Sequence, residues 1–382
     1  MKSVQPGQPA NRAWPLMRID RAALADLATG AAFLGSGGGG DPYYAMLLGE
    51  AELARRGTFE LVTLDALADD ALIVPCGWVG APTVSVEKLP SGKEALAGLK
   101  RLEAMLGRRI DAVMPIEIGG SNGLAPLVAA AELGVPVVDA DGMGRAFPES
   151  QMAIFNIHGI SACPSVVTAA SGSLTVIETS DNVEHERLAR ALAIALGGIA
   201  HMVEYPLSGA QAKAYAVPGS ISAAIAIGAA IRQARASGED PFGALFAALR
   251  DSGLYSHAGV LFDGKITDLE RETRGGFSVG RIMIESFDGQ SRVEVDFQNE
   301  NLLARRDGRI VAMVPDILTV MDRETADSIT TERLKYGQRV KLVGAAAPAM
   351  LRTGRALDFV GPGAFGYPDA YVPIEQLNGW VG

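Results

Sequence analysis

Histidine, cysteine and long apolar runs are scarce in this chain of 382 residues, and each scarcity excludes a class of protein. The four histidines show neither HxH nor HExxH spacing, so a histidine-rich metal site is not expected. Two cysteines, Cys76 and Cys163, are too few for a disulfide framework, and the first residues lack the apolar centre of a signal peptide. A reducing cytoplasm is the expected compartment.

Membranes and nucleic acids are also unexpected partners. The most apolar stretch, residues 216–231, is shorter than the roughly 20 residues that span a bilayer. Its alanines and glycines instead predict a buried helix that packs closely against a neighbour. The net charge is −10 and no run of Lys and Arg is present, which disfavours binding to a phosphate backbone.

The hydrophobic pattern predicts two α/β domains. After a flexible leader over residues 1–19, Asp20 caps an amphipathic helix that ends at Gly35. Short apolar strands then alternate with amphipathic helices, as in a sheet that is covered on both faces. We therefore predict a doubly wound, mostly parallel sheet domain over residues 20–165.

The second half, residues 166–382, is predicted to be an α+β domain. Asp181 is expected to cap a helix, and two further helices are predicted near residues 220–236 and 242–251. Three Asp-Gly pairs, which begin at Asp263, Asp288 and Asp307, are typical of tight hairpin turns between antiparallel strands.

A glycine-rich loop follows the first predicted helix and satisfies the GxGxxG pattern. A dinucleotide fingerprint follows a strand, however, and Asp41 would repel a phosphate at the next helix. Nucleotide binding is therefore a minor alternative, and a flexible turn between helices is another. We favour a loop whose bare backbone amides cradle a ligand. The candidate substrate-binding residues here are Ser36, Gly37, Gly38, Gly39, Gly40 and Asp41.

Polar residues follow two of the predicted parallel strands, where α/β sheets bind their ligands. Glu117, Asp139 and Asp141 are the candidate catalytic carboxylates. The alternative is a tight turn in which an aspartate caps backbone amides and Arg145 pairs with a carboxylate. The candidate substrate-binding residues nearby are Gly119, Gly120, Asn122 and Arg145.

Four further residues carry amide, thiol or imidazole groups that could take part in chemistry. Asn299 and Asn301 could bond a planar, amide-containing ligand, or could form an ordinary turn with Asn in the left-handed region. Cys76 is expected to be an inert buried thiol rather than a nucleophile. His158 follows an apolar run and is expected to lie in the core or at an interface.

Several segments together resemble the S-methyl-thiohydantoin desulfurase-like proteins, a family associated with hydantoinase/oxoprolinase systems. The resemblance covers roughly residues 20–375, and the glycine loop combined with DADGMGR in this order is its most specific part. The segments are LGSGGGGDPY (residues 34–43), EIGGSN (117–122), DADGMGRAFPE (139–149), the Asn299–Asn301 triplet and VPDIL (314–318).

The resemblance implies a C-terminal domain like the swivelling β/β/α type and removal of a sulfur substituent from a five-membered cyclic amidine. We therefore expect a hydrolase in which a carboxylate activates water and backbone amides hold the developing charge. The alternatives are a non-catalytic accessory subunit of a hydantoinase/oxoprolinase system and a nucleotide-dependent enzyme. We expect either no cofactor or a divalent metal ion, and we do not expect a nucleotide cofactor. The expected partners are a small-molecule substrate and further copies of the chain in a homo-oligomer.

Overall fold

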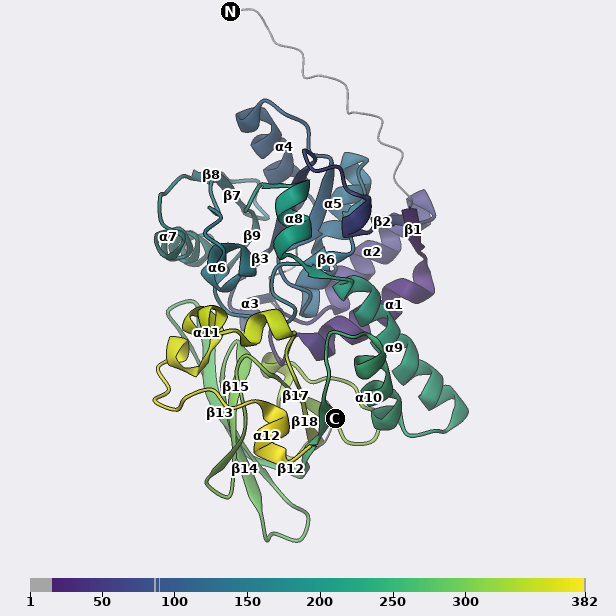
Figure 1. Cartoon of the computed structure of the whole chain (residues 1–382), viewed down its shortest axis with the longest axis vertical. Helices are drawn as coiled ribbons and strands as arrows, with labels where there is room; N and C mark the ends of the chain where they lie inside the picture. Colours follow the sequence, from purple (N-terminus) through teal and green to yellow (C-terminus); the bar gives the residue numbers. More distant parts are fainter. Residues whose placement is uncertain (1–15, 86, 89, 381–382) are drawn as a thin grey trace, which may run out of the picture.

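A mixed β-sheet forms the centre of the N-terminal half of the protein (Figure 1). It is seen in a computed structural model that describes residues 16–85, 87–88 and 90–380. The strands are, in sheet order, β1 (Leu16–Ile19), β2 (Phe59–Val62), β5 (Val137–Val138), β4 (Ala112–Pro115), β3 (Leu72–Gly80), β9 (Ile199–Val203), β7 (Ser165–Thr168) and β8 (Leu174–Ile177), with β10 (Leu207–Ser208) also beside β3. The central strands β2, β5, β4 and β3 run parallel, and the other pairings are antiparallel.

Both faces of this sheet are buried, as the apolar strands predict. In β3, Val74 contributes to one core and its neighbour Ile73 to another on the opposite face. The first core includes residues of α1 (Arg21–Leu34), α2 (Tyr43–Arg56), α4 (Glu94–Leu106) and α5 (Ala125–Leu133). The opposite face is covered by α6 (Ile154–Ile157), α7 (Asn182–Ala195) and α8 (Gly209–Tyr215). The predicted α/β class of this domain is confirmed.

The ends of the predicted N-terminal domain differ in detail from the observed sheet. Residues 1–15 of the predicted flexible leader lie outside the described residues, whereas Leu16–Ile19 form β1, paired with β2. At the other end, β7 begins at residue 165, β8, β9 and β10 follow it in the chain, and all four belong to this sheet. The boundary at residue 165 stays a prediction.

Two helices follow the sheet in sequence, of which the first packs on α1 and the second packs on the first (Figure 1). They are α9 (Ser220–Ser237) and α10 (Pro241–Asp251). A Cβ atom on Gly30 of α1 would lie 1.9 Å from the carbonyl oxygen of Ala224, and one on Gly228 would lie 1.9 Å from that of Asp26. Small side chains therefore allow the two helix backbones to touch. The predicted close-packed helix over residues 216–231 is confirmed, although it starts at Ser220.

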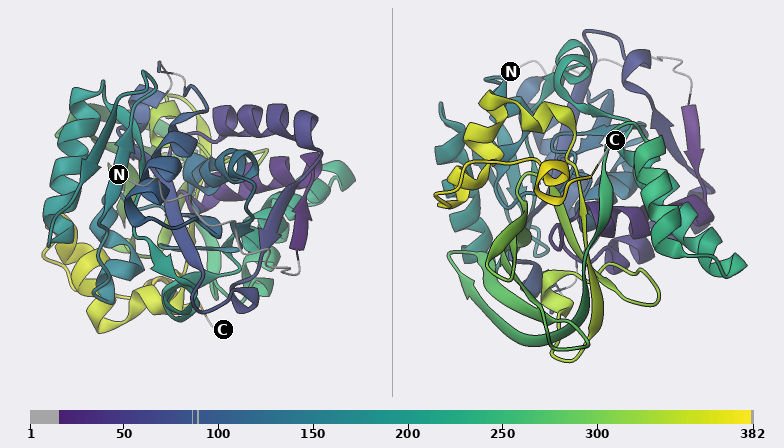
Figure 2. Two further views of the ribbon diagram at one scale, coloured as in Figure 1. Left: turned by 90° about the horizontal axis from the view of Figure 1, so that it is seen from above. Right: turned by 60° about the horizontal axis from the view of Figure 1, so that its bottom comes forward.

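An antiparallel sheet forms the C-terminal half and curves into a half-barrel (Figure 2, right). Its order is β16 (Arg309–Met313), β15 (Glu300–Arg306), β14 (Arg292–Gln298), β13 (Phe277–Glu285), β12 (Ala258–Arg274), β18 (Arg339–Ala345) and β17 (Ile317–Asp322). This confirms the α+β character predicted for this half. Of the last helices, α11 (Gly354–Val360) packs on α6 of the N-terminal half, and α12 (Ile374–Asn378) packs on β16 of the C-terminal sheet (Figure 1).

Two of the three predicted Asp-Gly hairpin turns are confirmed. Asp288 lies between β13 and β14, and Asp307 lies between β15 and β16. The third prediction is wrong, because Asp263 and Gly264 lie inside the long strand β12. A Cβ on Gly264 would lie 2.2 Å from the carbonyl oxygen of Glu285 on β13, so glycine here permits close strand contact rather than a turn.

Short segments complete the connections. Strand β6 (Ala140–Asp141) pairs with β11 (Val217–Pro218) next to the start of α9, and α3 (Pro82–Ser85) follows β3. Within the part of the chain that the structure describes, no helix combines the length and apolarity needed to cross a membrane.

Candidate functional site

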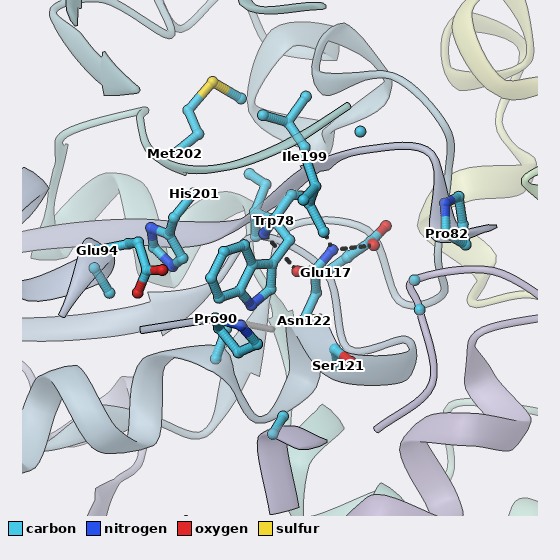
Figure 3. A pocket seen from close by; sticks show the side chains of 18 of the residues that line it. Trp78, Pro82, Pro90, Glu94, Glu117, Ser121, Asn122, Ile199, His201 and Met202 are labelled. Atoms are coloured by element: carbon cyan, nitrogen blue, oxygen red, sulfur yellow. Dashed lines mark hydrogen bonds between the residues drawn. The ribbon is translucent and has the colours of Figure 1, made fainter. Parts of the chain in front are cut away.

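A cavity of about 140 Å³ lies where β3 and β4 end and the glycine loop meets the C-terminal sheet. Strand β4 stops at Pro115 while β3 continues to Gly80, so the chain after β4 turns away and leaves an opening. Figure 3 shows Trp78 of β3 together with Glu117 and Asn122, which follow β4. The cavity therefore lies at the carboxyl ends of central parallel strands, where α/β sheets bind ligands.

Glu117 is the central carboxyl group of the cavity. Its two oxygens accept hydrogen bonds from Asn122 Nδ2 at 2.6 Å and from the backbone N–H of Phe147 at 2.9 Å. Burial raises the pKa of Glu117 to about 8, although these hydrogen bonds oppose the shift. At neutral pH this side chain is therefore predominantly protonated and can donate a proton.

Two more buried carboxyl groups line the same cavity. Glu300 begins β15 of the C-terminal sheet, and burial, reinforced by the charge of Glu117, raises its pKa well above the ordinary value. Glu204 follows β9, and burial raises its pKa to about 8, with Ser150 as its hydrogen-bond donor. Glu117 therefore interacts electrostatically with both carboxyl groups, so its titration is linked to theirs.

The lining of the cavity is strongly acidic. Among the described residues that line it, seven carry a carboxyl group and two carry a positive charge. Both cations are occupied: Lys88 donates to the carbonyl oxygens of Leu196 and Ile199, and Arg190 pairs with Glu186 at 2.6 Å. The cavity thus offers a surplus of acidic groups to whatever enters it.

The structure places part of the predicted glycine loop at the cavity and part against the C-terminal sheet. Gly39, Gly40 and Asp41 line the cavity. Ser36 instead exchanges hydrogen bonds with the backbone of Leu318 through its hydroxyl, at 2.9 Å each way. Gly37 and Gly38 do not line it either: the carbonyl of Gly37 accepts from Thr331, and Gly38 packs on Glu300.

The loop also packs on the turn after β4. The carbonyl oxygens of Gly39 and Gly40 accept from the backbone N–H of Ser121 at 2.9 and 3.0 Å. A Cβ on Gly120 would lie 2.3 Å from the Gly40 oxygen, and one on Gly119 would lie 2.7 Å from Gly35 Cα. Gly119 and Gly120 therefore allow close contact between two loops and do not themselves line the cavity.

Asp139 and Asp141 do not line the cavity. Asp139 accepts hydrogen bonds from the backbone and hydroxyl of Ser222 in the first turn of α9. One oxygen of Asp141 accepts three backbone N–H groups, from Ile118, Met143 and Gly144, at 2.7–3.0 Å. Burial raises the pKa of Asp141 to about 6 against these bonds. The capping turn considered as the alternative is present at Asp141, whereas Asp139 instead binds the start of α9, and neither candidate catalytic aspartate reaches the cavity.

Arg145 is fully buried and joins the two domains. It donates to backbone carbonyl oxygens at Ala146, Pro315, Asp316 and Asn301, at 2.6–3.3 Å. Burial lowers its pKa to about 10, and nearby carboxyl groups limit the shift. Arg145 does not line the cavity. Its donors bind backbone carbonyl oxygens, three of them in the C-terminal half, rather than a carboxylate of the DADGMGR turn.

The side chains of the two asparagines near the end of β14 form hydrogen bonds with backbone groups. Asn299 has a positive φ of 57° and accepts from the Ser278 N–H at 2.9 Å, and it lies at the rim of the cavity. Asn301 donates to the carbonyl of Leu318 at 2.8 Å and does not line the cavity. The left-handed Asn turn considered from the sequence is present at Asn299.

The cysteine and histidine predictions have different outcomes. Burial raises the pKa of Cys76 to about 12, which keeps the thiol protonated, as expected for an inert buried cysteine. His158 is exposed at the end of α6 and stacks on Tyr215 at 4.2 Å, so it does not lie in the core, and its place at an interface stays a prediction. The apolar run before it is buried, but the chain turns outward at His158.

Three cavity residues, Glu94, His201 and Glu204, were not candidates from the sequence. The order of β3 and β9 in the N-terminal sheet brings Trp78 and Glu204 together, and the docking of the C-terminal sheet adds Glu300. His201 and Glu94 are also buried in the lining. A polar residue inside an apolar strand, such as His201 in β9, was the available signal. No group of three His, Cys, Asp or Glu side chains suited to a metal ion occurs in the described part of the chain.

The fold and the cavity define a two-domain α/β protein with a buried acidic pocket beside the domain junction. The chain belongs to the S-Me-THD-like family, because residues 22–179 match the family's N-terminal domain and residues 180–374 its C-terminal domain. This confirms the resemblance seen in the sequence motifs. A crystal structure of a protein from Chromobacterium violaceum is similar, with 25% sequence identity and a TM-score of 0.78 over 94% of this chain and 100% of that chain. No curated protein matches this chain.

Proposed function

We propose that this protein hydrolyses a small five-membered cyclic amidine of the S-methyl-thiohydantoin type, giving a hydantoin and a thiol. Family membership supports the substrate class. The observation that carries the proposal is Glu117, a buried carboxyl group in the cavity whose pKa is raised to about 8. Proton-transfer residues work best when their pKa lies near the operating pH.

The reaction needs proton transfer at two atoms. Water adds to the ring carbon that carries sulfur, and the adjacent ring nitrogen takes up a proton. The carbon–sulfur bond then breaks, its electron pair leaves with sulfur, and the hydroxyl proton is transferred to the thiolate. The products are the ring carbonyl and a thiol, and no oxidant or reductant is consumed.

Glu117 serves both transfers in this proposal. In its protonated form it donates to the ring nitrogen while water adds, and the resulting carboxylate takes a proton from the added water. The reprotonated group then donates to the leaving sulfur as the hydroxyl proton is removed. Asn122 holds the carboxyl in place by its bond to Oε1, and burial keeps the pKa of Glu117 high.

The glycine loop retains a role at the cavity through Gly40. For the backbone N–H of Gly40 no acceptor is found among the described residues, and the residue lines the cavity. An amide in this position can hold a ring oxygen on which negative charge develops, a contribution of about 3 kcal/mol for a single donor. Glycine is suited to the position because φ at Gly40 is 75°.

The test is hydrolysis of an S-methyl-thiohydantoin by the purified protein, with the hydantoin followed by liquid chromatography and mass spectrometry. We expect turnover by the wild type and a loss of about 100-fold or more in kcat for Glu117→Gln. Glu60→Gln, which changes an exposed glutamate of β2, is the matched control and should keep full activity.

Two outcomes would contradict the proposal. Equal turnover by Glu117→Gln and the wild type would remove Glu117 from the reaction. Saturable binding of thiohydantoins or hydantoins without any turnover would favour the alternative of a non-catalytic accessory subunit.

A further inference from the structure

One end of the cavity holds buried polar groups that the proposed reaction does not use. His201 and Glu94 line the cavity and are 1% and 2% exposed. Neither ring nitrogen of His201 has a hydrogen-bond partner among the described residues, and neither does Glu94 Oε2. Buried polar atoms are nearly always paired, so three unpaired atoms that line one cavity call for a ligand.

The residues beside His201 in the sheet do not form hydrogen bonds with its ring nitrogens. His201 on β9 lies directly across from Trp78 on β3 and from Thr168 on β7, so the three side chains form a row on one face. Trp78 meets the imidazole edge to face, with 5.0 Å between ring centroids, and Thr168 Oγ1 is itself unpaired. The two neighbours therefore pack against the imidazole but form no hydrogen bond with either of its nitrogens.

The charges at this end favour a cation. Burial lowers the pKa of His201 to about 4, so the ring is neutral and offers a lone pair at neutral pH. Glu94 is the first residue of α4, where the helix dipole stabilises negative charge. Its Oε1 accepts from the Ser91 N–H at 2.7 Å, which leaves Oε2 for a ligand. The two cations in the lining are already occupied.

Trp78 connects this end to the proposed reaction centre (Figure 3). Its backbone N–H donates to Asn122 Oδ1 at 2.6 Å, and Asn122 in turn bonds Glu117. In Figure 3, Glu94 and His201 appear on one side of Trp78, and Glu117 and Asn122 on the other. A ring held at Glu117 would send a substituent past the indole, a surface that attracts cations.

We infer that Trp78, His201 and Glu94 form a specificity site for a positively charged side chain on the substrate ring, an alkylammonium or a guanidinium group. The inference rests on the proposed function for the identity of the ring. The cation donates to Glu94 Oε2 and to the free lone pair of His201, and its alkyl chain lies against Trp78. A substituent of the same length that ends in a methyl group leaves all three polar atoms unpaired.

Binding of unreactive hydantoins by isothermal titration calorimetry tests the site without requiring turnover. The matched pair carries an aminobutyl or a pentyl group on the tetrahedral ring carbon. We expect the wild type to bind the aminobutyl compound about 10-fold more tightly. Glu94→Gln keeps the Oε1 acceptor for Ser91 and should remove most of this preference without weakening the pentyl compound.

His201→Phe distinguishes a role of His201 in binding the cation from a role in stabilising the fold. Phenylalanine keeps a planar ring against Trp78 and removes two unpaired buried nitrogens, so the melting temperature should rise while the preference for the aminobutyl compound falls. A lower melting temperature would assign His201 to stability alone and overturn its part in the site.

The two proposals fail in different ways. Equal affinity for both compounds in the wild type, or an unchanged preference in Glu94→Gln, overturns the specificity site even if thiohydantoins are hydrolysed. A preference for the aminobutyl compound that Glu94→Gln abolishes, with no turnover of either thiohydantoin, supports the specificity site and rejects the proposed reaction.

Discussion

Glu300 Oε1 accepts a hydrogen bond from the backbone N–H of Gly39 at 3.2 Å, which joins the first residue of β15 to the glycine loop. The contact brings the two domains together at the edge of the cavity. A Cβ atom on the preceding residue, Gly38, would lie 1.9 Å from the same carboxyl oxygen. Part of the glycine in this loop therefore serves close packing between domains.

Gly38→Ala should destabilise the protein. The added methyl group overlaps Glu300, whose buried carboxyl has little room to move, and overpacking of this kind costs about 1–3 kcal/mol. Urea unfolding measures the difference. Gly354→Ala is the control, since no atom lies within 4 Å of its Cβ position, and it should change stability little. Equal stability of the two variants would show that the loop tolerates side chains.

Arg145→Lys should also destabilise the protein, despite keeping the charge. The guanidinium of Arg145 donates to four carbonyl oxygens in both domains, and a lysine ammonium cannot reproduce that planar set of donors. Leaving buried acceptors without donors costs about 1–3 kcal/mol each. We expect a loss of at least about 3 kcal/mol in chemical denaturation.

The control for Arg145 is Arg101→Lys in α4, where the side chain is exposed. That variant should match the wild type. If Arg145→Lys were as stable as Arg101→Lys, the four carbonyl contacts would not hold the domains together.

The stability of the protein should fall with rising pH through Glu117. Burial raises its pKa from 4.5 to about 8, so between these values the folded state holds a proton that the unfolded chain has released. The contribution is complete below about pH 4.5, declines as the pH rises and is lost above about pH 8. Glu117→Gln cannot ionise, and its unfolding free energy should lack this part of the slope, up to about 1.4 kcal/mol per pH unit.

Denaturation curves of the wild type and Glu117→Gln at several pH values across this range provide the measurement. Because the variant differs at one titrating group, the difference between the two slopes isolates Glu117 together with its interacting neighbour Glu300. Parallel slopes would mean that Glu117 is already ionised at neutral pH in the folded protein.

Much of the fold follows from local sequence. Asp20 and Asp181 cap helices because their carboxylates accept backbone N–H groups nearby in the chain. Asp288 and Asp307 introduce hairpin turns for a similarly local reason. Asp263-Gly264 is the same dipeptide but lies inside β12. Glycine is needed there because β13 approaches the backbone closely, and that contact depends on residues far away in the chain.

The candidate site could be predicted only in part. Glu117, Asn122, Gly39, Gly40, Asp41 and Asn299 were named from their positions after strands or in polar loops, and they line the cavity. Asp141 was named for the same reason, yet three backbone N–H groups occupy one of its oxygens. A sequence shows that a carboxylate follows a strand but does not show which donors surround it.

The sequence by itself determined the alternation of strands and helices, the caps and turns, and the family motifs, because these depend on residues that are close along the chain. Only the tertiary structure decided which acids share a cavity. Glu117, Glu204 and Glu300 lie far apart in sequence, and the order of the strands and the docking of the C-terminal sheet bring them together. The raised pKa of Glu117 has the same origin, because burial and neighbouring charge are properties of the assembled fold.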